Sequence, residues 1–376
     1  MPIPILNAFS LVTVALNRIL AHVDRWVHYI SGYILYFFFR GLKPQTHTRP
    51  YKTKDGRFYS PAVVITGASE GIGLSTATHL AARGFTVFAT AQDNNEVSKI
   101  KSVADRSNST NISQSGGSIH PCIMDVLSHD SISHCASYIE SVLAGDRDKP
   151  LVGVVNNAGY CMISPMELTP EKDVRRLFEL DFWAYIAVIK AFLPLIKRNK
   201  GRFVNIGSYG AFVNPPMWVP YCSLKAAIEG MTRAWRLELM PFGVGMTTVR
   251  PGWTRTGGLG PKGQKAWDHY WDNVSKGAVG VDTFGRIVKA DGPVLEAEEK
   301  IYRPMMDKWY KITQAAIEGI GQPAEAVAAT VHEALTDRFS QPTYTVGYDA
   351  LLGQMVRDLT PENVYEYGMG KTFGSL

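Results

Sequence analysis

Short apolar runs alternate with helical patterns along the middle of the chain. A β-branched run at Ala62–Thr66 precedes a glycine-containing turn, and an Ala-rich helical pattern follows over Leu74–Arg83. Further strand-like runs lie at Phe85–Thr90, Cys122–Met124 and Val152–Val155. Strands this apolar, separated by helices, predict an α/β fold in which helices cover both faces of a parallel sheet.

The turn after the first strand is rich in glycine. It reads Gly67-Ala68-Ser69-Glu70-Gly71-Ile72-Gly73 and leads directly into the helical pattern. Strand, glycine turn and helix are the context of a dinucleotide-binding fingerprint, because glycines let the backbone approach a pyrophosphate and a helix N-terminus offers it free N–H groups. The pattern predicts a single Rossmann-type doubly wound sheet, with the cofactor at Gly67, Ser69, Glu70, Gly71, Ile72 and Gly73.

A second group of residues is suited to proton transfer. Tyr221 and Lys225 stand four residues apart, and Ser208 precedes the tyrosine by thirteen. Residues at i and i+4 share a helix face, so the ammonium would stabilise the phenolate and lower the pKa of Tyr221. Such a phenol can exchange protons, and Ser208 would hold a substrate oxygen beside it. The pair alone does not exclude an exposed Tyr/Lys pair on an ordinary helix.

These motifs occur together with two more. Thr66–Gly73 reads TGxxxGIG, Asn156–Gly159 reads NNAG, and Pro251–Thr256 reads PGxxxT. With Ser208, Tyr221 and Lys225 in this order and spacing, the chain resembles the short-chain dehydrogenase/reductase family over residues 62–256. The resemblance continues more weakly through residues 341–350. This segment is similar to the corresponding segment in the retinol, hydroxysteroid and 3-hydroxybutyrate dehydrogenase branch of the family.

The resemblance implies an oxidoreductase that uses NAD(P) and transfers a hydride between nicotinamide and an alcohol. Tyr221 would exchange the hydroxyl proton, Lys225 would bind the nicotinamide ribose, and Ser208 would hold the substrate oxygen. The alternatives are an NADPH-dependent carbonyl or acyl-chain reductase of the same family, and a catalytically inactive cofactor-binding membrane scaffold. Further cofactor-site residues implied by the resemblance are Gln92, Asp125, Asn156, Asn157, Ala158, Gly159, Pro251, Gly252, Thr254 and Thr256.

Asp181 departs from the family pattern. The family usually has an asparagine here, where it helps hold a water that links the lysine to solvent; the aligned residues 177–184 place Asp181 there. A carboxylate accepts a hydrogen bond from water or ammonium, but its charge would partly cancel the pull of Lys225 on the phenol. We therefore group Asp181 with the catalytic residues and expect a more alkaline optimum for oxidation than in an Asp181→Asn variant. A tolerated substitution with the water retained is the alternative.

The residues near the expected adenosine ribose bear on the choice between NAD and NADP. Glu70 lies in the turn, and Ala91 and Gln92 end the second strand where NAD binders typically have an Asp. A carboxylate repels a 2′-phosphate unless a cation offsets it. The sequence therefore favours NAD(H), with NADP(H) as the alternative. Asp125, after the third strand, is either the family's adenine-contacting acid or a strand-end cap.

Residues 1–39 are unusually apolar. The runs Ile3–Leu16 and Trp26–Phe39 are separated by charged residues, and a basic linker follows from Arg40. Each run is about 14 residues, or about 21 Å as a helix, which is shorter than the ~30 Å hydrocarbon core. We expect residues 1–58 to be an interfacial or re-entrant membrane anchor with a basic linker, on the endoplasmic reticulum first and the mitochondrion second by the branch resemblance. A hairpin packed on the domain, or a dimer contact, is the alternative.

The remaining boundaries follow from these segments. The Rossmann-type domain is expected over residues 59–350, with a substrate lid at about 253–310 and a C-terminal tail over 351–376. The pocket should be lined by residues 209–219 and by the lid. Aromatic residues in the lid suit a lipophilic alcohol or ketone such as a steroid, retinoid or hydroxy-lipid; packing onto the domain or a membrane is the alternative. These residues are Trp267, Tyr270, Trp271, Phe284 and Tyr302.

Composition and charge indicate which classes of partner the protein can bind. The 376 residues include 39 basic and 34 acidic ones, a net charge of +5, and no nucleic-acid-binding motif is present. The four cysteines form no CxxC pair, so no metal or redox site is indicated. Cys222, next to the tyrosine, is either reactive toward alkylating agents or a small packing residue. The family resemblance suggests a homodimer or homotetramer through the helices that carry Asp181 and Tyr221.

Overall fold

The computed structural model describes residues 58–108, 116–256, 278–282, 287–289 and 296–373, with residues 51–52 and four positions between 23 and 30. The rest of the expected anchor lies outside the described residues, as do Trp267, Tyr270, Trp271 and Phe284 of the expected lid. The four isolated positions, Val23, Trp26, Val27 and Ile30, are all exposed. In the described part of the chain, no helix combines the length and apolar character that a bilayer crossing requires.

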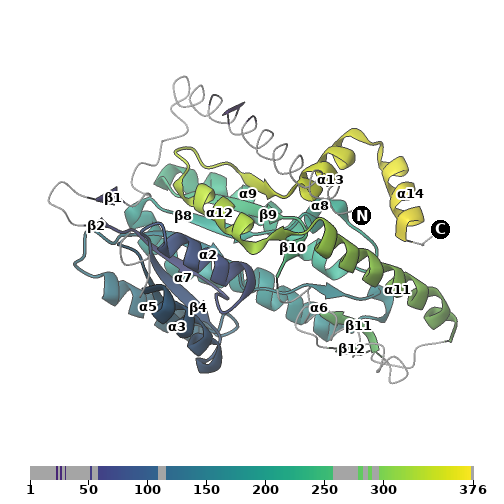
Figure 1. The fold of residues 1–376 in the computed structure, drawn as a ribbon, viewed down its shortest axis with the longest axis horizontal. Coiled ribbons are helices and arrows are strands. Elements are labelled where there is room, and N and C mark those ends of the chain that lie inside the picture. The colour runs from purple at the N-terminus through teal and green to yellow at the C-terminus, as the bar shows by residue number, and fades with distance from the viewer. Residues whose placement is uncertain are drawn as a thin grey trace, which may run out of the picture.

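A seven-stranded parallel sheet forms the centre of the molecule (Figure 1). Its strand order is β14-β9-β8-β6-β3-β4-β5. The chain moves outward through β3, β4 and β5, then returns to the other side of β3 with β6, so the order reverses between β3 and β6. Ligands of such sheets bind at this reversal, beyond the carboxyl ends of the strands. The strands are β3 (Ala62–Ile65), β4 (Thr86–Ala91), β5 (Ser118–Ile123), β6 (Leu151–Asn156), β8 (Arg202–Ile206), β9 (Gly245–Pro251) and β14 (Thr343–Val346).

Helices cover both faces of the sheet, which confirms the predicted α/β fold. Alternate strand residues point to opposite faces: Val63 and Ile65 belong to one apolar cluster, and Ala62 and Val64 to the other. The first cluster is completed by α2 (Gly71–Ala81), α3 (Asn94–Asn108) and α12 (Ala324–Thr336). The second is completed by α5 (His129–Leu143), α7 (Ala184–Asn199) and α9 (Val219–Leu239).

Smaller elements surround the carboxyl edge of the sheet. Strand β7 (Met162–Ile163) pairs with β11 (Ala278–Asp282), which pairs with β12 (Ile287–Lys289), and β10 (Thr254–Arg255) pairs with β13 (Gln322–Pro323). Near these lie η1 (Met166–Leu168), α6 (Glu171–Phe178), the π-helical segment η2 (Glu179–Trp183) and α8 (Gly210–Val213). The remaining short elements are β1 (Tyr51–Lys52), β2 (Phe58–Tyr59) and η3 (Met240–Phe242).

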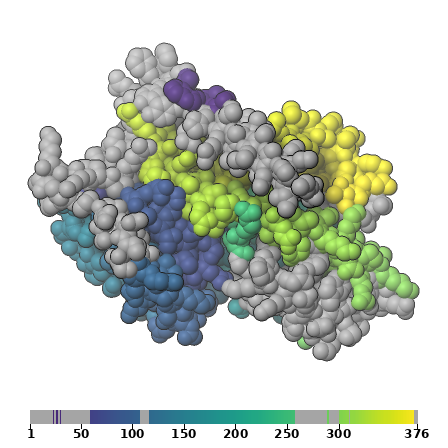
Figure 2. Space-filling model, in the orientation of Figure 1, coloured from purple at the N-terminus to yellow at the C-terminus, as the bar shows by residue number. Residues whose placement is uncertain are grey.

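Helices also form in the expected lid and tail. The described part of the lid includes α11 (Glu296–Gly319), whose Met306 and Trp309 are buried. The tail contributes α13 (Tyr348–Leu359) and α14 (Glu362–Phe373). Figure 2 shows α14 in yellow on the surface beside the green α11, and the Tyr365 hydroxyl donates to the carbonyl oxygen of Val213 at 2.7 Å. The tail therefore packs on the elements that border the site.

Candidate active site

The glycine turn packs tightly between β3 and α2. Gly67 and Gly71 have positive φ values of 61° and 57°, a conformation that favours glycine. A Cβ on Gly67 would lie 2.8 Å from the Cα of Ala158, and one on Gly73 would lie 2.3 Å from the carbonyl oxygen of Gly67. The turn has no room for side chains at these positions, and α2 begins at Gly71 with its unpaired N–H groups beside the cavity.

Thr66 and Asn157 hold this turn against the end of β6. The hydroxyl of Thr66 accepts hydrogen bonds from the backbone N–H groups of Asn157 and Ala158, both at 2.9 Å. The side-chain amide of Asn157 donates to the carbonyl oxygens of Thr66 and Gly67, also at 2.9 Å. The predicted NNAG residue Asn157 therefore fixes the shape of the turn as well as bordering the cavity.

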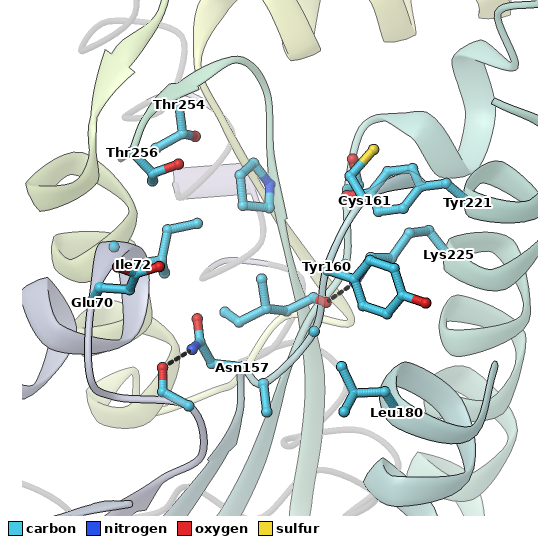
Figure 3. A pocket seen from close by; sticks show the side chains of 18 of the residues that line it. Glu70, Ile72, Asn157, Tyr160, Cys161, Leu180, Tyr221, Lys225, Thr254 and Thr256 are labelled. Carbon is cyan, nitrogen blue, oxygen red and sulfur yellow. Dashed lines mark hydrogen bonds between the residues drawn. The ribbon is translucent and has the colours of Figure 1, made fainter. Parts of the chain in front are cut away.

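A cavity of about 310 Å³ lies beyond the carboxyl ends of the strands. Figure 3 shows Glu70 and Ile72 on one side of it, with Tyr221 and Lys225 on the other. Three predicted residues are absent from its lining. Gly73 lies behind the turn, and Asp181 lies behind Lys225 and Gly159. Asn156 is completely buried in β6, where its side-chain amide donates to Oδ1 of Asn205 at 2.9 Å. The predicted residues that line it are Gly67, Ser69, Glu70, Gly71, Ile72, Gln92, Asp125, Asn157, Ala158, Gly159, Ser208, Tyr221, Lys225, Pro251, Gly252, Thr254 and Thr256.

Ser208 and Tyr221 lie next to each other in the lining of this cavity. Ser208 follows β8, and Tyr221 lies in the first turn of α9. The serine side chain hydrogen-bonds the phenol, and its oxygen accepts the N–H of Gly210 at 3.1 Å. The structure thus brings together the hydroxyl pair that the spacing of the sequence predicted.

The pKa of Tyr221 is raised well above its ordinary value of 10. Burial is the main cause, the nearby Cys161 adds to it, the hydrogen bond with Ser208 opposes it, and Asp181 raises it further. The expected net lowering of this pKa is therefore not found. Loss of hydration outweighs the effect of an ammonium whose nitrogen lies 5.5 Å from the centre of the phenol ring.

Lys225 is held by two oxygens from other elements. Its ammonium donates to Oδ2 of Asp181 and to the carbonyl oxygen of Ile206, both at 3.2 Å. Asp181 is completely buried in η2, and its Oδ1 accepts the N–H of Tyr160 at 3.1 Å. Burial raises the pKa of Asp181 from 3.8 to about 6, while Lys225 and the Tyr160 N–H oppose this increase. The carboxylate is therefore in direct contact with the ammonium.

Helix α9 also connects the site to the sheet. Glu229 lies one turn beyond Lys225 and pairs with Arg250 of β9 through two hydrogen bonds of 2.6 and 2.5 Å. Both side chains are largely buried. Tyr221, Lys225 and Glu229 thus occupy successive turns of one helix face.

Aromatic rings form a wall beside Tyr221. Trp218 lies at the centre, with its ring centre 5.5 Å from that of Tyr221, 5.6 Å from that of Trp253 and 5.3 Å from that of Trp309. Tyr209 and Trp253 are 5.7 Å apart by the same measure. Trp309 belongs to α11, so the described part of the lid packs onto this wall.

Sequence reasoning missed some of the lining residues. Glu96 in the first turn of α3 lines the cavity, and its Oε2 accepts the N–H of Gln92 at 3.4 Å. Its position five residues after the end of β4 was the available signal. Tyr160 and Cys161 also line the cavity, directly after the NNAG segment. Burial raises the pKa of the neighbouring Cys222 thiol to about 12, which favours its role as a packing residue.

Asp125 carries features of both roles considered for it. It lines the cavity, and its Oδ1 accepts the N–H of Leu127 at 3.0 Å. Its own N–H donates to the hydroxyl of Ser131 at 2.9 Å. The carboxylate therefore caps the turn after β5 while one edge faces the cavity.

Comparison with known proteins defines the family. Residues 61–267 match the family model for short chain dehydrogenases, so the chain belongs to this family. It is 31% identical over 222 residues to mitochondrial D-beta-hydroxybutyrate dehydrogenase of Mus musculus, covering 59% of this chain and 62% of that protein. It is 35% identical over 209 residues to estradiol 17-beta-dehydrogenase 2 of Rattus norvegicus, covering 55% of this chain and 51% of that protein.

The match spans about half to three-fifths of the length of these two relatives. The fold is similar to that of a short chain dehydrogenase from Burkholderia cenocepacia J2315, solved in complex with NADP. The TM-score is 0.55 at 18% identity, and the similarity covers 82% of this chain and 97% of that chain. At this identity the likeness concerns the fold alone.

Proposed function

We propose that this protein is an NAD(H)-dependent oxidoreductase that transfers a hydride between nicotinamide and a lipophilic alcohol or ketone. The observation that carries the proposal is the shared cavity, which Ser208, Tyr221 and Lys225 line opposite the glycine turn. The close packing of Gly67 and Gly73 fits a turn against which a pyrophosphate can lie. When bound, the nicotinamide supplies the hydride chemistry, which amino-acid side chains lack.

Proton transfer is assigned to Tyr221. Its phenol would exchange a proton with the substrate oxygen while Ser208, hydrogen-bonded to the phenol, holds that oxygen in place. The Lys225 ammonium would stabilise the phenolate, and its contact with Asp181 orients the ammonium. The buried surroundings of these groups strengthen each interaction by excluding water.

Acidic side chains support NAD(H) over NADP(H). Glu70, Glu96 and Asp125 line the part of the cavity where the fold directs the adenosine. Among the described residues of the lining, Lys225 at the opposite end is the one Lys or Arg. A 2′-phosphate would meet this negative charge with no cation beside it. NADP(H) is the alternative and would accompany the carbonyl or acyl-chain reductase function.

The aromatic wall supports a lipophilic substrate. Tyr209, Trp218 and Trp253 line the cavity beside the phenol. The body of a steroid, a retinoid or a hydroxy-lipid would bury apolar surface against them. The relatives are named for substrates of different size, hydroxybutyrate and estradiol. The preference of this chain for the larger, lipophilic substrate is therefore argued from its own aromatic rings.

Membrane attachment through the N-terminal region is part of this proposal, with the endoplasmic reticulum favoured over the mitochondrion. The support is the apolar sequence over residues 1–39 and the exposure of Val23, Trp26, Val27 and Ile30. Their spacing is that of one helix face, and an exposed apolar face is stable against an apolar partner such as lipid.

We also propose a homodimer or homotetramer through the elements that carry Asp181 and Tyr221. Trp183 of η2 is 54% exposed and Leu237 of α9 is 65% exposed. Apolar side chains on these elements would be covered by the same elements of a second copy.

Nucleotide binding and turnover together test the function. Calorimetric titration of the full-length protein in detergent should show NADH binding at least about tenfold tighter than NADPH binding. With NAD, turnover is measured on estradiol and on D-3-hydroxybutyrate, and estradiol should be the better substrate. Tyr221→Phe should keep its NADH affinity and lose about 10³-fold in kcat, whereas Tyr138→Phe, at an exposed tyrosine of α5, should change neither. Tighter NADPH binding would favour the reductase, and nucleotide binding by a wild-type protein without turnover would favour the scaffold.

A further inference from the structure

The loop after β9 is held by a carboxylate from outside the parallel sheet. The backbone N–H of Trp253 donates to Oδ2 of Asp349 at 2.6 Å, across 96 positions of the chain. Asp349 lies in the first turn of α13, where its own N–H and that of Ala350 also stabilise its charge. Residues 251–254 line the cavity, so a helix of the C-terminal region fixes part of its wall.

Two glycines leave room for this carboxylate. A Cβ on Gly252 would lie 2.1 Å from Oδ2 of Asp349, and one on Gly347 would lie 2.4 Å from Oδ1. Real Cβ atoms do not come this close to other atoms, because interiors are packed at van der Waals distances. The glycine of the PGxxxT motif therefore makes space for Asp349 as well as bordering the cofactor cavity.

The anchored loop reaches the phenol through two indole rings. The ring centre of Trp253 lies 5.6 Å from that of Trp218, which lies 5.5 Å from that of Tyr221. Trp253 also contacts Tyr209, with the ring centres 5.7 Å apart. Because these rings are in contact and line the cavity, a shift in the backbone of Trp253 would move the wall beside the reacting groups.

Burial of the Asp349 carboxylate at this position costs folding free energy. Burial raises the pKa of Asp349, and its Oδ1 has no hydrogen-bond partner among the described residues. A neutral side chain would avoid the desolvation of a charge. An ionised acceptor, however, holds a backbone N–H about twice as strongly as a neutral one does.

The docking of α13 does not depend on this carboxylate alone. Gln354 accepts a hydrogen bond from Arg250 of β9 at 3.2 Å, and Ala350 is completely buried. A variant at Asp349 should therefore keep α13 in place while releasing the loop.

We propose that Asp349 is a positioning residue that sets the aromatic wall beside Tyr221 by holding the backbone N–H of Trp253. It thereby controls how tightly the alcohol or ketone is bound. The inference rests on the proposed function for its substrate and adds a role for α13, which lies outside the doubly wound sheet.

Hydrogen exchange of the full-length protein without ligand tests the anchoring by itself. Asp349→Ala should increase exchange in the peptide of residues 251–256 by about tenfold, with α9 unchanged. Asp349→Asn should have a smaller effect because its amide oxygen still accepts the N–H. Asp358→Asn, at an exposed position of the same helix, is the matched control and should have no effect. Unchanged exchange in Asp349→Ala would overturn the proposal.

Steady-state kinetics with estradiol and NAD then test the consequence. Asp349→Ala should raise the KM for estradiol about tenfold and the KM for NAD by a clearly smaller factor, because only part of the cofactor site lies on the released loop. The KM values of Asp349→Asn should lie between those of wild type and Asp349→Ala. In a Trp253→Ala background, where the ring is gone, Asp349→Ala should add little to the KM for estradiol. Equal increases in both KM values would indicate a merely structural role and overturn the proposal. A wild-type protein without turnover would contradict the proposed function instead, and the exchange measurement would still decide the anchoring.

Discussion

The ammonium of Lys225 and the carboxylate of Asp181 form a buried ion pair, with 3.2 Å between Nζ and Oδ2. Their side chains are 6% and 0% exposed. The pair brings a negative charge close to the Tyr221 phenol, since Asp181 is among the groups that raise the pKa of Tyr221. The Lys225 ammonium therefore interacts with two acidic groups, the carboxyl of Asp181 and the phenol of Tyr221.

Asp181→Asn should shift the pH optimum of alcohol oxidation toward lower pH. Above about pH 6 Asp181 is ionised and helps raise the pKa of Tyr221; the amide removes that charge. Profiles of kcat/KM against pH are compared with those of Glu179→Gln, an exposed residue of the same π-helical segment. Coincident profiles for wild type and Asp181→Asn would contradict this prediction.

The same carboxylate should make stability depend on pH. Its pKa in the folded protein, about 6, is above its ordinary value of 3.8, so the folded state binds the proton more tightly than the unfolded state. Wild type should gain stability relative to Asp181→Asn as the pH falls through this window. Urea denaturation of both proteins at pH 7 and pH 5 measures this. A difference in unfolding free energy that is the same at both pH values would refute it.

Glu96→Arg should reverse the nucleotide preference. The side chain lies beside Gln92 at the adenine end, and a guanidinium there could pair with both oxygens of a 2′-phosphate. NADPH affinity should rise about tenfold or more, and NADH affinity should fall. Ser98→Arg adds a guanidinium at an exposed position of α3 outside the cavity lining and should leave both affinities unchanged.

Gly73→Ala should destabilise the protein and weaken nucleotide binding. Its Cβ would lie 2.3 Å from the carbonyl oxygen of Gly67 and 2.6 Å from the side-chain nitrogen of Asn157. We expect a loss of roughly 1–3 kcal/mol in unfolding free energy. Gly230→Ala is the contrasting variant, because, apart from its own helix turn, no atom of the described residues lies within 4 Å of the added Cβ. It should stabilise α9 by about 0.5–1 kcal/mol. Urea denaturation and NADH titration measure both effects, and equal stabilities would show that the turn can relax.

Glu229→Gln should be strongly destabilising. It leaves the buried guanidinium of Arg250 without its charged partner, a change that typically costs about 3–5 kcal/mol. Glu171→Gln breaks an ion pair with Arg175 in which both side chains are about three-quarters exposed, so its effect should be within about 0.5 kcal/mol. Denaturation of both variants gives the comparison, and similar losses would contradict the role of burial.

Local patterns in the sequence were sufficient to predict the strand, glycine turn and helix over residues 62–83. They work there because the turn needs glycine for its backbone and the strand needs apolar residues on both faces. The helix begins at Gly71 rather than Leu74, since the glycines of the turn also form its first residues. Tyr221 and Lys225 could be paired from spacing because helix geometry relates them directly.

Contacts between distant segments could not be predicted in the same way. Spacing shows that Lys225 shares a helix face with Tyr221, but it does not show that burial dominates the pKa of the phenol. The hydrogen bond between Asp349 and Trp253 joins positions with no local relationship. Glu96 enters the cavity only because α3 starts close to the end of β4.

Tyr221, Lys225 and Glu229 share one face of α9. This shared face restricts insertions and deletions of residues within the helix. One added or deleted residue between Tyr221 and Glu229 would rotate the following residues by about 100° around the helix axis. If Glu229 stayed on Arg250, the phenol would leave the cavity; if the phenol stayed, Arg250 would lose its partner. Substitutions can alter this segment one residue at a time, but single-residue insertions and deletions should be absent from every functional descendant of this protein.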